Sequence, residues 1–285
     1  MKSLTFAVAA AVLSCGGATL KEPAYDTLIA HRGESIDAPE NTMPAFKTAV
    51  DRGFGFECDV YLSADKKLFT FHDGTLKRTT GGRHTEKCTE ASWEDTISKI
   101  NVGGWGKWKG SKFDPTTSAL LEDVLKLARD GRYIYVEVKG NNPSWVPYIK
   151  DVFAKQGKAT PKNALFISFG PAVCAELKRQ MPDYRVYWLT GSRKRADKKT
   201  GEPARPYRPE EIIEILKRLG VDGVDMGFNA DDVTAAFIKT IKDAGFEFHT
   251  WTIDNLDRAK LAFSRGAQTV TTNRAKGLLD EYKAK

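Results

Sequence analysis

The chain has 285 residues, of which 41% are hydrophobic and 28% charged, and its formal net charge is +7. This composition is that of an ordinary soluble globular protein and excludes a disordered, collagen-like or coiled-coil chain. A basic surface attracts anions such as phosphodiesters, lipid headgroups or nucleic acid. Because no zinc finger, RNA-recognition motif or basic leucine zipper is visible, we expect no nucleic-acid partner, and the basic run at 193–199 is expected to be a solvated loop.

The first eighteen residues have the features of an export signal. Lys2 supplies a positive charge, residues 4–13 are apolar but too few to span a bilayer, and small residues follow. The string Val12-Leu13-Ser14-Cys15 resembles a bacterial lipobox, which would make Cys15 a lipidated first residue; the alternative is ordinary cleavage after Ala18. We therefore expect 1–18 to be a signal peptide or a lipoprotein signal. The mature protein should be periplasmic or at the cell surface, with a membrane tether through Cys15 in the lipoprotein case.

Three cysteines remain without Cys15, namely Cys58, Cys88 and Cys174. An odd number is not a disulfide framework, and no pair has the close spacing of a zinc site. One bridge could form, and Cys58–Cys88 is the best candidate pair.

From residue 27 onward, short apolar runs alternate with amphipathic stretches, the rhythm of βαβ units. Eight strands are expected, at residues 27–31, 55–61, 133–139, 164–169, 185–189, 222–226, 247–253 and 268–271. Eight helices are expected, at residues 42–52, 120–129, 144–156, 171–181, 209–219, 231–244, 255–264 and 275–282. This order predicts an α/β fold, a TIM-type (β/α)8 barrel over residues 26–285.

One stretch, at about residues 65–117, interrupts the alternation after the second strand. It begins with an apparent hairpin, in which residues 65–67 form the turn and residues 68–72 return as a strand. A segment rich in glycine and tryptophan follows. Because long loops in compact domains are usually functional, we expect a small insertion that leans over the barrel mouth; the alternative is surface decoration far from the site.

Three carboxylates are predicted to face the barrel interior. Glu57 and Asp59 are separated by one residue on a strand, so both point the same way, and Glu137 lies two residues before Lys139 near the end of the next strand. Inward carboxylates are costly unless something neutralises them. With no Cys or His at matching spacing, the three form a hard oxygen site suited to Mg²⁺ or Ca²⁺.

The chain has only four histidines. His31 ends the first strand and His72 ends the returning strand of the hairpin, so both could converge on a bound phosphate as an acid–base pair. His84 lies in a polar stretch and should be exposed. His249 shares a strand face with Trp251 and is expected to be a satisfied core histidine.

In chain order the sequence contains the motifs His31-Arg32-Gly33, Pro39-Glu40-Asn41-Thr42, Glu57-x-Asp59-Val60, His72-Asp73, Arg78-Thr79-Thr80-Gly81 and Glu137-Val138-Lys139. Together with Ser168-Phe169 and Trp251-Thr252, this ordered set resembles the glycerophosphodiester phosphodiesterase family over about residues 28–279. Two places depart from the family pattern. Thr272-Asn273-Arg274-Ala275 stands where Thr-Asp-x-Pro is frequent, and Ala119 stands where a proline usually precedes the helix.

The resemblance implies the roles of the site residues. One divalent cation, Ca²⁺ or Mg²⁺, would be held by Glu57, Asp59 and Glu137. The histidines His31 and His72 would be the catalytic pair, with His31 as the base and His72 as the acid. The substrate contacts would be Arg32 and Lys139 on the phosphate, with Phe169 and Trp251 at strand ends.

The resemblance further implies the hydrolysis of a small phosphodiester, in which the glycerol 2-hydroxyl attacks phosphorus and expels the alcohol. Water then opens the cyclic phosphate, and the products are glycerol 3-phosphate and an alcohol such as choline or ethanolamine. Two other functions fit the same motifs. One is a phospholipase-D-like enzyme acting on intact or lyso-phospholipids, and the other is a barrel that binds phosphodiesters without turnover.

Overall fold

Eight parallel strands close into a barrel in the computed structural model, which describes residues 20–196, 201 and 203–285. Around the barrel the strands follow the order β1 (Leu28–Ala30), β11 (Val270–Thr272), β10 (Glu247–Trp251), β9 (Gly223–Gly227), β6 (Val186–Thr190), β5 (Ala164–Ser168), β4 (Ile134–Val138) and β2 (Gly55–Leu62). The pairing of β2 with β1 completes the ring. The predicted TIM-type (β/α)8 barrel is therefore confirmed.

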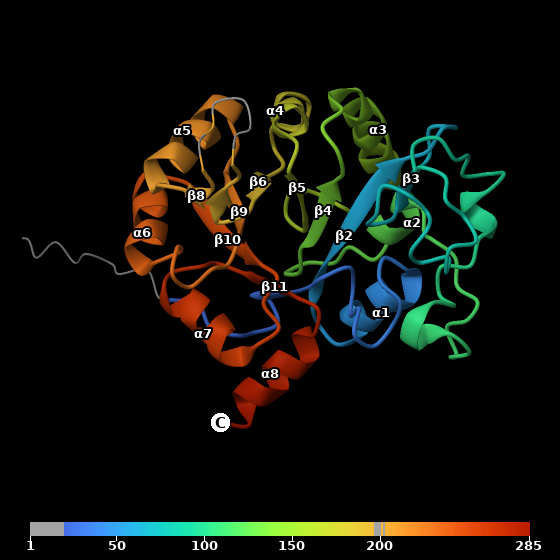
Figure 1. Cartoon of the computed structure of the whole chain (residues 1–285), viewed down its shortest axis with the longest axis horizontal. Helices are drawn as coiled ribbons and strands as arrows, with labels where there is room; N and C mark the ends of the chain where they lie inside the picture. Colours follow the sequence, from blue (N-terminus) through green and yellow to red (C-terminus); the bar gives the residue numbers. More distant parts are fainter. Residues whose placement is uncertain (1–19, 197–200, 202) are drawn as a thin grey trace, which may run out of the picture.

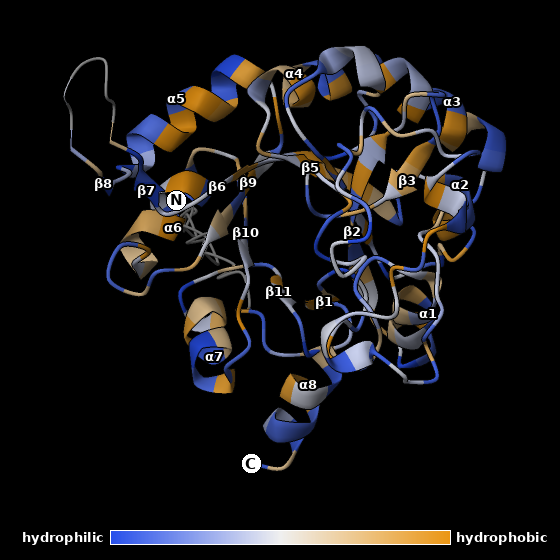
Figure 2. Ribbon diagram, turned by 45° about the vertical axis from the view of Figure 1, so that its right-hand side comes forward, coloured by the Kyte–Doolittle hydropathy of each residue, from blue (hydrophilic) through white to orange (hydrophobic). Residues whose placement is uncertain are grey.

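The helices surround the strands and follow them in sequence (Figure 1). Their bounds are α1 (Met43–Asp51), α2 (Leu121–Leu125), α3 (Val146–Gln156), α4 (Pro171–Gln180), α5 (Pro209–Leu219), α6 (Ala235–Asp243), α7 (Leu256–Ser264) and α8 (Ala275–Lys283). Helices such as α3 and α5 carry both hydrophobic and hydrophilic residues, as an amphipathic helix against a sheet must (Figure 2). A short 3₁₀ turn, η3 (Pro143–Trp145), precedes α3.

Strand residues alternate between two hydrophobic layers. On β2, Phe56, Cys58 and Val60 face the helices and belong to the main core. The inner layer of the barrel is a separate cluster that consists of Ile29, Tyr135, Leu165, Ile167, Tyr187 and Leu189. This alternation leaves Glu57 and Asp59 on the inner face, as the sequence predicted.

The barrel interior near the amino-terminal ends of the strands contains a group of mutually hydrogen-bonded polar residues, called here the lower cluster: Tyr187, Glu247, His249 and Thr269. His249 is buried and stacks on Tyr187, with ring centroids 4.3 Å apart. Its Nδ1 lies 2.7 Å from Thr269 Oγ1, and Tyr187 Oη donates to Glu247 Oε2 at 2.9 Å. His249 is thus the satisfied core histidine that the sequence predicted.

The insertion after the second strand begins with β3 (Leu68–Thr70), which pairs antiparallel with β2. It continues through two 3₁₀ turns, η1 (Ile97–Lys99) and η2 (Gly106–Trp108), and has its own small hydrophobic cluster around Phe69, Leu76 and Ile97. Lys107 Nζ donates to the backbone oxygen of Ile36 at 2.6 Å, which attaches the insertion to the loop after β1. The insertion therefore borders the barrel mouth.

The structure corrects the expected cysteine bridge. The proposed Cys58–Cys88 bridge is wrong: both thiols are free and buried, because Cys58 belongs to the main core whereas Cys88 belongs to the cluster of the insertion. The export signal with Cys15, and part of the basic run at 193–199, lie outside the described residues.

Within the part of the chain that the structure describes, no helix is long and apolar enough to cross a membrane. Two strands of two residues each, β7 (Arg193–Lys194) and β8 (Arg205–Pro206), pair antiparallel, and β7 is the first part of the basic run.

Candidate active site

Three carboxylates meet on the inner surface of the barrel, on the neighbouring strands β2 and β4. Asp59 pairs in register with Glu137, and Glu57 precedes Asp59 by two residues, so all three side chains project from the same face. One oxygen of each lies within 4.8 Å of the others, and all three residues are buried. The structure therefore brings together the three residues predicted as metal ligands.

The chemistry of this group fits a hard divalent cation. Glu57 Oε1 is buried and has no hydrogen-bond partner among the described residues. Lys139 Nζ lies 2.8 Å from both Asp59 Oδ1 and Glu137 Oε1, and Arg32 Nε lies 3.4 Å from Asp59 Oδ2. Two positive side chains do not neutralise three buried carboxylates, and carboxylate oxygens are the ligands that Ca²⁺ and Mg²⁺ prefer.

Burial and mutual repulsion set the protonation of the three carboxylates. Burial, and then the charge of Asp59, raises the pKa of Glu57 well above its ordinary value and raises the pKa of Glu137 to about 7. Burial also opposes the ionisation of Asp59, but Lys139 and Arg32 outweigh it and hold the pKa of Asp59 below its ordinary value. Asp59 is therefore the most readily ionised of the three. Because carboxyl groups bind metal ions in their deprotonated form, a bound cation would favour ionisation of Glu57 and Glu137.

His31 follows β1 and is oriented by residues after β11 and β10. Its Nδ1 lies 2.7 Å from Asn273 Oδ1, while Asn273 Nδ2 donates to Asp254 Oδ2 at 2.6 Å. Since the Asn273 amide nitrogen faces the Asp254 carboxylate, the Asn273 oxygen accepts a hydrogen bond from His31 Nδ1–H. In the neutral ring this leaves Nε2 unprotonated and 3.9 Å from Glu57 Oε2. Burial, and then the charge of Arg32, lowers the pKa of His31 to about 4. His31 is therefore a neutral imidazole with a lone pair in the site.

His72 follows β3 and has a different partner. Its Nδ1 lies 2.8 Å from Asp73 Oδ1, and Arg78 Nε donates to Asp73 Oδ2 at 2.8 Å. Arg78 also binds Glu40, which in turn accepts from Arg32 Nη1 at 3.0 Å. Burial lowers the pKa of His72, whereas the neighbouring carboxylates of Asp59 and Asp73 oppose that shift. His72 is thus supported by a carboxylate, and His31 by an amide.

Two loop residues at the site, Arg32 and Asn41, have a left-handed backbone conformation that non-glycine residues rarely adopt. Arg32 has φ 58° and Asn41 has φ 56°. The conformation lets the Arg32 backbone N–H donate to Glu57 Oε2 at 2.9 Å. Asn41 Nδ2 donates to Asp59 Oδ2 at 2.6 Å and its Oδ1 accepts from the Asp59 N–H at 3.0 Å. This local strain therefore serves to fix two of the carboxylates.

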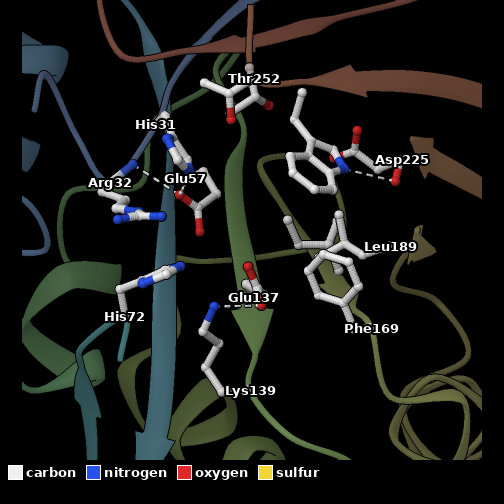
Figure 3. A pocket seen from close by; sticks show the side chains of 13 residues that line it. His31, Arg32, Glu57, His72, Glu137, Lys139, Phe169, Leu189, Asp225 and Thr252 are labelled. Carbon is white, nitrogen blue, oxygen red and sulfur yellow. Dashed lines mark hydrogen bonds and ion pairs between the residues drawn. The ribbon is translucent and has the colours of Figure 1, made fainter. Parts of the chain in front are cut away.

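The predicted residues share one pocket of about 230 Å³ at the barrel mouth. Figure 3 shows His31, Arg32, Glu57 and His72 on one side of it, and Phe169, Leu189 and Asp225 on the other. Glu137 and Lys139 lie between the two sides. The remaining lining residues are Ile167, Trp251, Thr252 and Thr271. Every predicted site residue except the fully buried Asp59 lines this pocket.

Sequence reasoning assigned no role to three polar residues that the structure places at the site. Asn41 lies in one of the quoted motifs, and Asn273 lies at a departure from the family pattern, but neither motif showed what its side chain binds. Asp225 lies on β9 and faces the pocket. The alternation of the run Asp222–Met226 places Asp225 on the same strand face as Gly223, which was the available signal for an inward carboxylate.

A closed parallel barrel with buried carboxylates and two histidines at its mouth has the arrangement of a TIM-barrel enzyme, whose active site lies at the carboxyl ends of the strands. The model of the Glycerophosphoryl diester phosphodiesterase family matches residues 31–276. The chain therefore belongs to this family and is an enzyme, a phosphoric diester hydrolase.

Individual relatives agree with this assignment. Glycerophosphodiester phosphodiesterase 1 of Mus musculus is 25% identical over 246 residues, which cover 80% of this chain and 72% of the mouse protein. A glycerophosphodiester phosphodiesterase of Caldanaerobacter subterraneus subsp. tengcongensis is 31% identical over 163 residues, 56% of this chain and 64% of that protein.

Solved structures share the fold. A phosphodiesterase of Oleispira antarctica in complex with the product sn-glycerol-3-phosphate has a TM-score of 0.73 at 22% identity, covering 93% of this chain and 97% of that one. A glycerophosphodiester phosphodiesterase of Parabacteroides distasonis has a TM-score of 0.69 at 21% identity, covering 91% of this chain and 98% of that one.

Proposed function

We propose that the enzyme hydrolyses glycerophosphodiesters to glycerol 3-phosphate and an alcohol, with a divalent cation held by Glu57, Asp59 and Glu137. One observation supports the proposal most strongly. Two histidines that are anchored through Nδ1 line the same pocket as the carboxylates, and each has its Nε2 left for proton transfer. The Oleispira antarctica phosphodiesterase, which has the same fold, was solved in complex with its product sn-glycerol-3-phosphate, the product that we propose for this enzyme.

His31 is the base in the proposed reaction. As a neutral imidazole, it can accept the proton of the glycerol 2-hydroxyl at Nε2, so that the hydroxyl oxygen attacks phosphorus. The Asn273 oxygen holds the ring in the tautomer that this step requires, because it can accept only from a protonated Nδ1.

His72 is the acid. The phosphorus–oxygen bond to the leaving alcohol breaks as His72 donates the Nε2 proton to that oxygen. The Asp73 carboxylate, 2.8 Å from Nδ1, stabilises the imidazolium that must exist before this donation. The product of this half-reaction is a cyclic glycerol phosphate. In the second half, His72 accepts a proton from water, water oxygen attacks phosphorus, and His31 returns its proton to the glycerol 2-oxygen.

The phosphate charge is balanced by the positive side chains at the carboxylates. Arg32 presents a planar guanidinium beside Asp59, and Lys139 presents a compact ammonium between Asp59 and Glu137. When bound, a divalent cation supplies Lewis-acid stabilisation of the phosphoryl oxygens. Phe169 and Trp251, whose ring centroids are 5.6 Å apart, form the aromatic wall that would contact the organic part of the substrate.

The proposal is tested with a panel of phosphodiesters assayed after exhaustive EDTA treatment and after addition of Mg²⁺ or Ca²⁺. We expect glycerophosphocholine and glycerophosphoethanolamine to be hydrolysed with metal and not with chelator. Full activity in chelator would contradict the metal site. Preferential hydrolysis of lysophospholipid micelles would instead support the phospholipase-D-like alternative, and binding without product release would support the non-catalytic one.

We also propose that the protein is exported, with residues 1–18 as a signal peptide or lipoprotein signal. The basis is the amino-terminal pattern of a positive residue, an apolar stretch and small residues. Membrane fractionation of cells that express the full chain tests this location.

A further inference from the structure

Asp225 is a buried acid on the side of the pocket that faces the histidines. It lies on β9 and pairs in register with Leu189 on β6 and His249 on β10. The residue is 1% exposed, and it lines the pocket together with Ile167, Leu189 and Trp251. Figure 3 shows it across the pocket from His31 and Glu57.

Neither carboxyl oxygen of Asp225 has a hydrogen-bond partner among the described residues. Trp251 Nε1 donates to the backbone oxygen of Asp225 at 3.1 Å, not to its side chain. Nearby Glu247, in the lower cluster, is by contrast paired with Tyr187 and His249. A buried polar group without a partner is costly, so Asp225 is a group that a ligand would satisfy.

The positions of the two histidines indicate which half of the substrate lies near Asp225. The His31 side chain is 16% exposed, whereas that of His72 is 34% exposed and comes from the hairpin at the rim. If His31 is the base, the glycerol half, which carries the attacking hydroxyl, occupies the deeper part of the pocket. The leaving alcohol then lies beside His72, toward solvent.

We propose that Asp225 hydrogen-bonds the terminal C1 hydroxyl of the glycerol half and thereby selects deacylated glycerophosphodiesters; this inference rests on the proposed function. A hydroxyl can donate to an oxygen of Asp225 whether that side chain is a carboxylate or a carboxylic acid, because both forms keep an acceptor oxygen. An acyl ester at C1, as in a lysophospholipid, removes the hydroxyl proton. The apolar neighbours Ile167 and Leu189 offer no replacement partner.

The test compares two substrates that both keep the attacking hydroxyl. Glycerophosphocholine carries the C1 hydroxyl, and 2-hydroxypropyl phosphocholine lacks it. Wild type, Asp225→Asn and Asp225→Leu are assayed with Mg²⁺ for kcat/KM. Asp225→Asn keeps a hydrogen-bonding side chain of the same shape and is the matched control, and thermal unfolding of each variant reports whether it is folded.

We expect wild type to prefer glycerophosphocholine by about 10- to 100-fold, the range for leaving one buried hydrogen-bonding group without its partner. Asp225→Leu should abolish this preference by losing activity on glycerophosphocholine alone, and Asp225→Asn should retain part of it. A preference that persists in Asp225→Leu, or an equal loss on both substrates in folded protein, would overturn the proposal. The proposal would also be overturned if Asp225→Leu lost activity on glycerophosphocholine but not on glycerol methyl phosphodiester, because Asp225 would then recognise the choline ammonium.

A separate measurement distinguishes failure of the inference from failure of the proposed function. If wild type hydrolyses no glycerophosphodiester, the function is wrong. Calorimetry with sn-glycerol 3-phosphate and 2-hydroxypropyl phosphate then applies the same comparison to binding. Equal affinity of wild type for the two ligands would overturn the role of Asp225, and a preference for sn-glycerol 3-phosphate that is lost in Asp225→Leu would support it.

Discussion

Replacing each site histidine with alanine should separate the acid from the base, because the two rings have different partners. His31 Nδ1 is held by an amide oxygen and His72 Nδ1 by a carboxylate. Each ring therefore has one nitrogen for one proton transfer. An acid–base group supplies about 10²–10⁴-fold in rate, or about 2.7–5.5 kcal/mol of transition-state stabilisation. We expect His31→Ala and His72→Ala each to lose turnover on glycerophosphocholine within that range.

The assay uses a second substrate, the p-nitrophenyl ester of glycerol 3-phosphate, which keeps the glycerol nucleophile. Its leaving group departs with little protonation, so the first half-reaction, measured as release of p-nitrophenol, should be restored in His72→Ala and not in His31→Ala. Circular dichroism and thermal unfolding serve as the folding control, since both side chains are only partly buried. Equal losses for both variants on both substrates would refute the assignment of roles. Turnover near wild type in either variant would refute the site itself.

Four further outcomes are expected. Asp73→Asn should lower kcat on glycerophosphocholine by about 10- to 100-fold but leave the p-nitrophenyl substrate almost unaffected, since it removes the charge that supports the acid; equal losses would contradict this. Gly33→Ala should destabilise the protein by at least about 2 kcal/mol in urea unfolding, because φ is 77° and the new Cβ would lie 2.5 Å from the backbone of Ala45. Burial raises the pKa of Glu247, but its hydrogen bonds outweigh burial and hold it at about 2, below the unfolded value of about 4.3. Its stabilising effect is therefore present above about pH 4.3 and lost as the pH falls toward 2, so Glu247→Gln should destabilise at neutral pH and not at about pH 2. If Cys15 is lipidated, Cys15→Ser should remove the lipid and release the protein from membranes; a mature chain beginning at Thr19 would show ordinary cleavage instead.

The barrel and the carboxylate group could be predicted because they depend on local patterns. The eight strands are short apolar runs at regular spacing, and the two-residue period of a strand places Glu57 beside Asp59. Element ends were less accurate. The helix expected at 120–129 ends at Leu125, and the one expected from 231 begins at Ala235, where the Thr234 side chain accepts from the Phe237 N–H as an N-cap.

The partners of the site residues could not be predicted, because they come from distant parts of the chain. Asn273, which fixes the His31 tautomer, is 242 residues away from it in sequence. The lack of a hydrogen-bond partner for the Asp225 side chain among the described residues depends on everything packed around it, whereas a strand pattern shows only which way the side chain points. The positive φ of Arg32 likewise depends on the contact of its N–H with Glu57.

The place where the chain enters the barrel has a consequence for how the enzyme meets its substrates. Tyr25, just before β1, packs on Phe54 ahead of β2 and under Lys283 at the end of α8. These are the amino-terminal ends of the strands, so the leader attaches on the side opposite the mouth. If Cys15 is lipidated, the ten residues from Cys15 to Tyr25 span at most about 36 Å, so the tether would attach at the amino-terminal ends of the strands and leave the mouth at the other end of the barrel unobstructed.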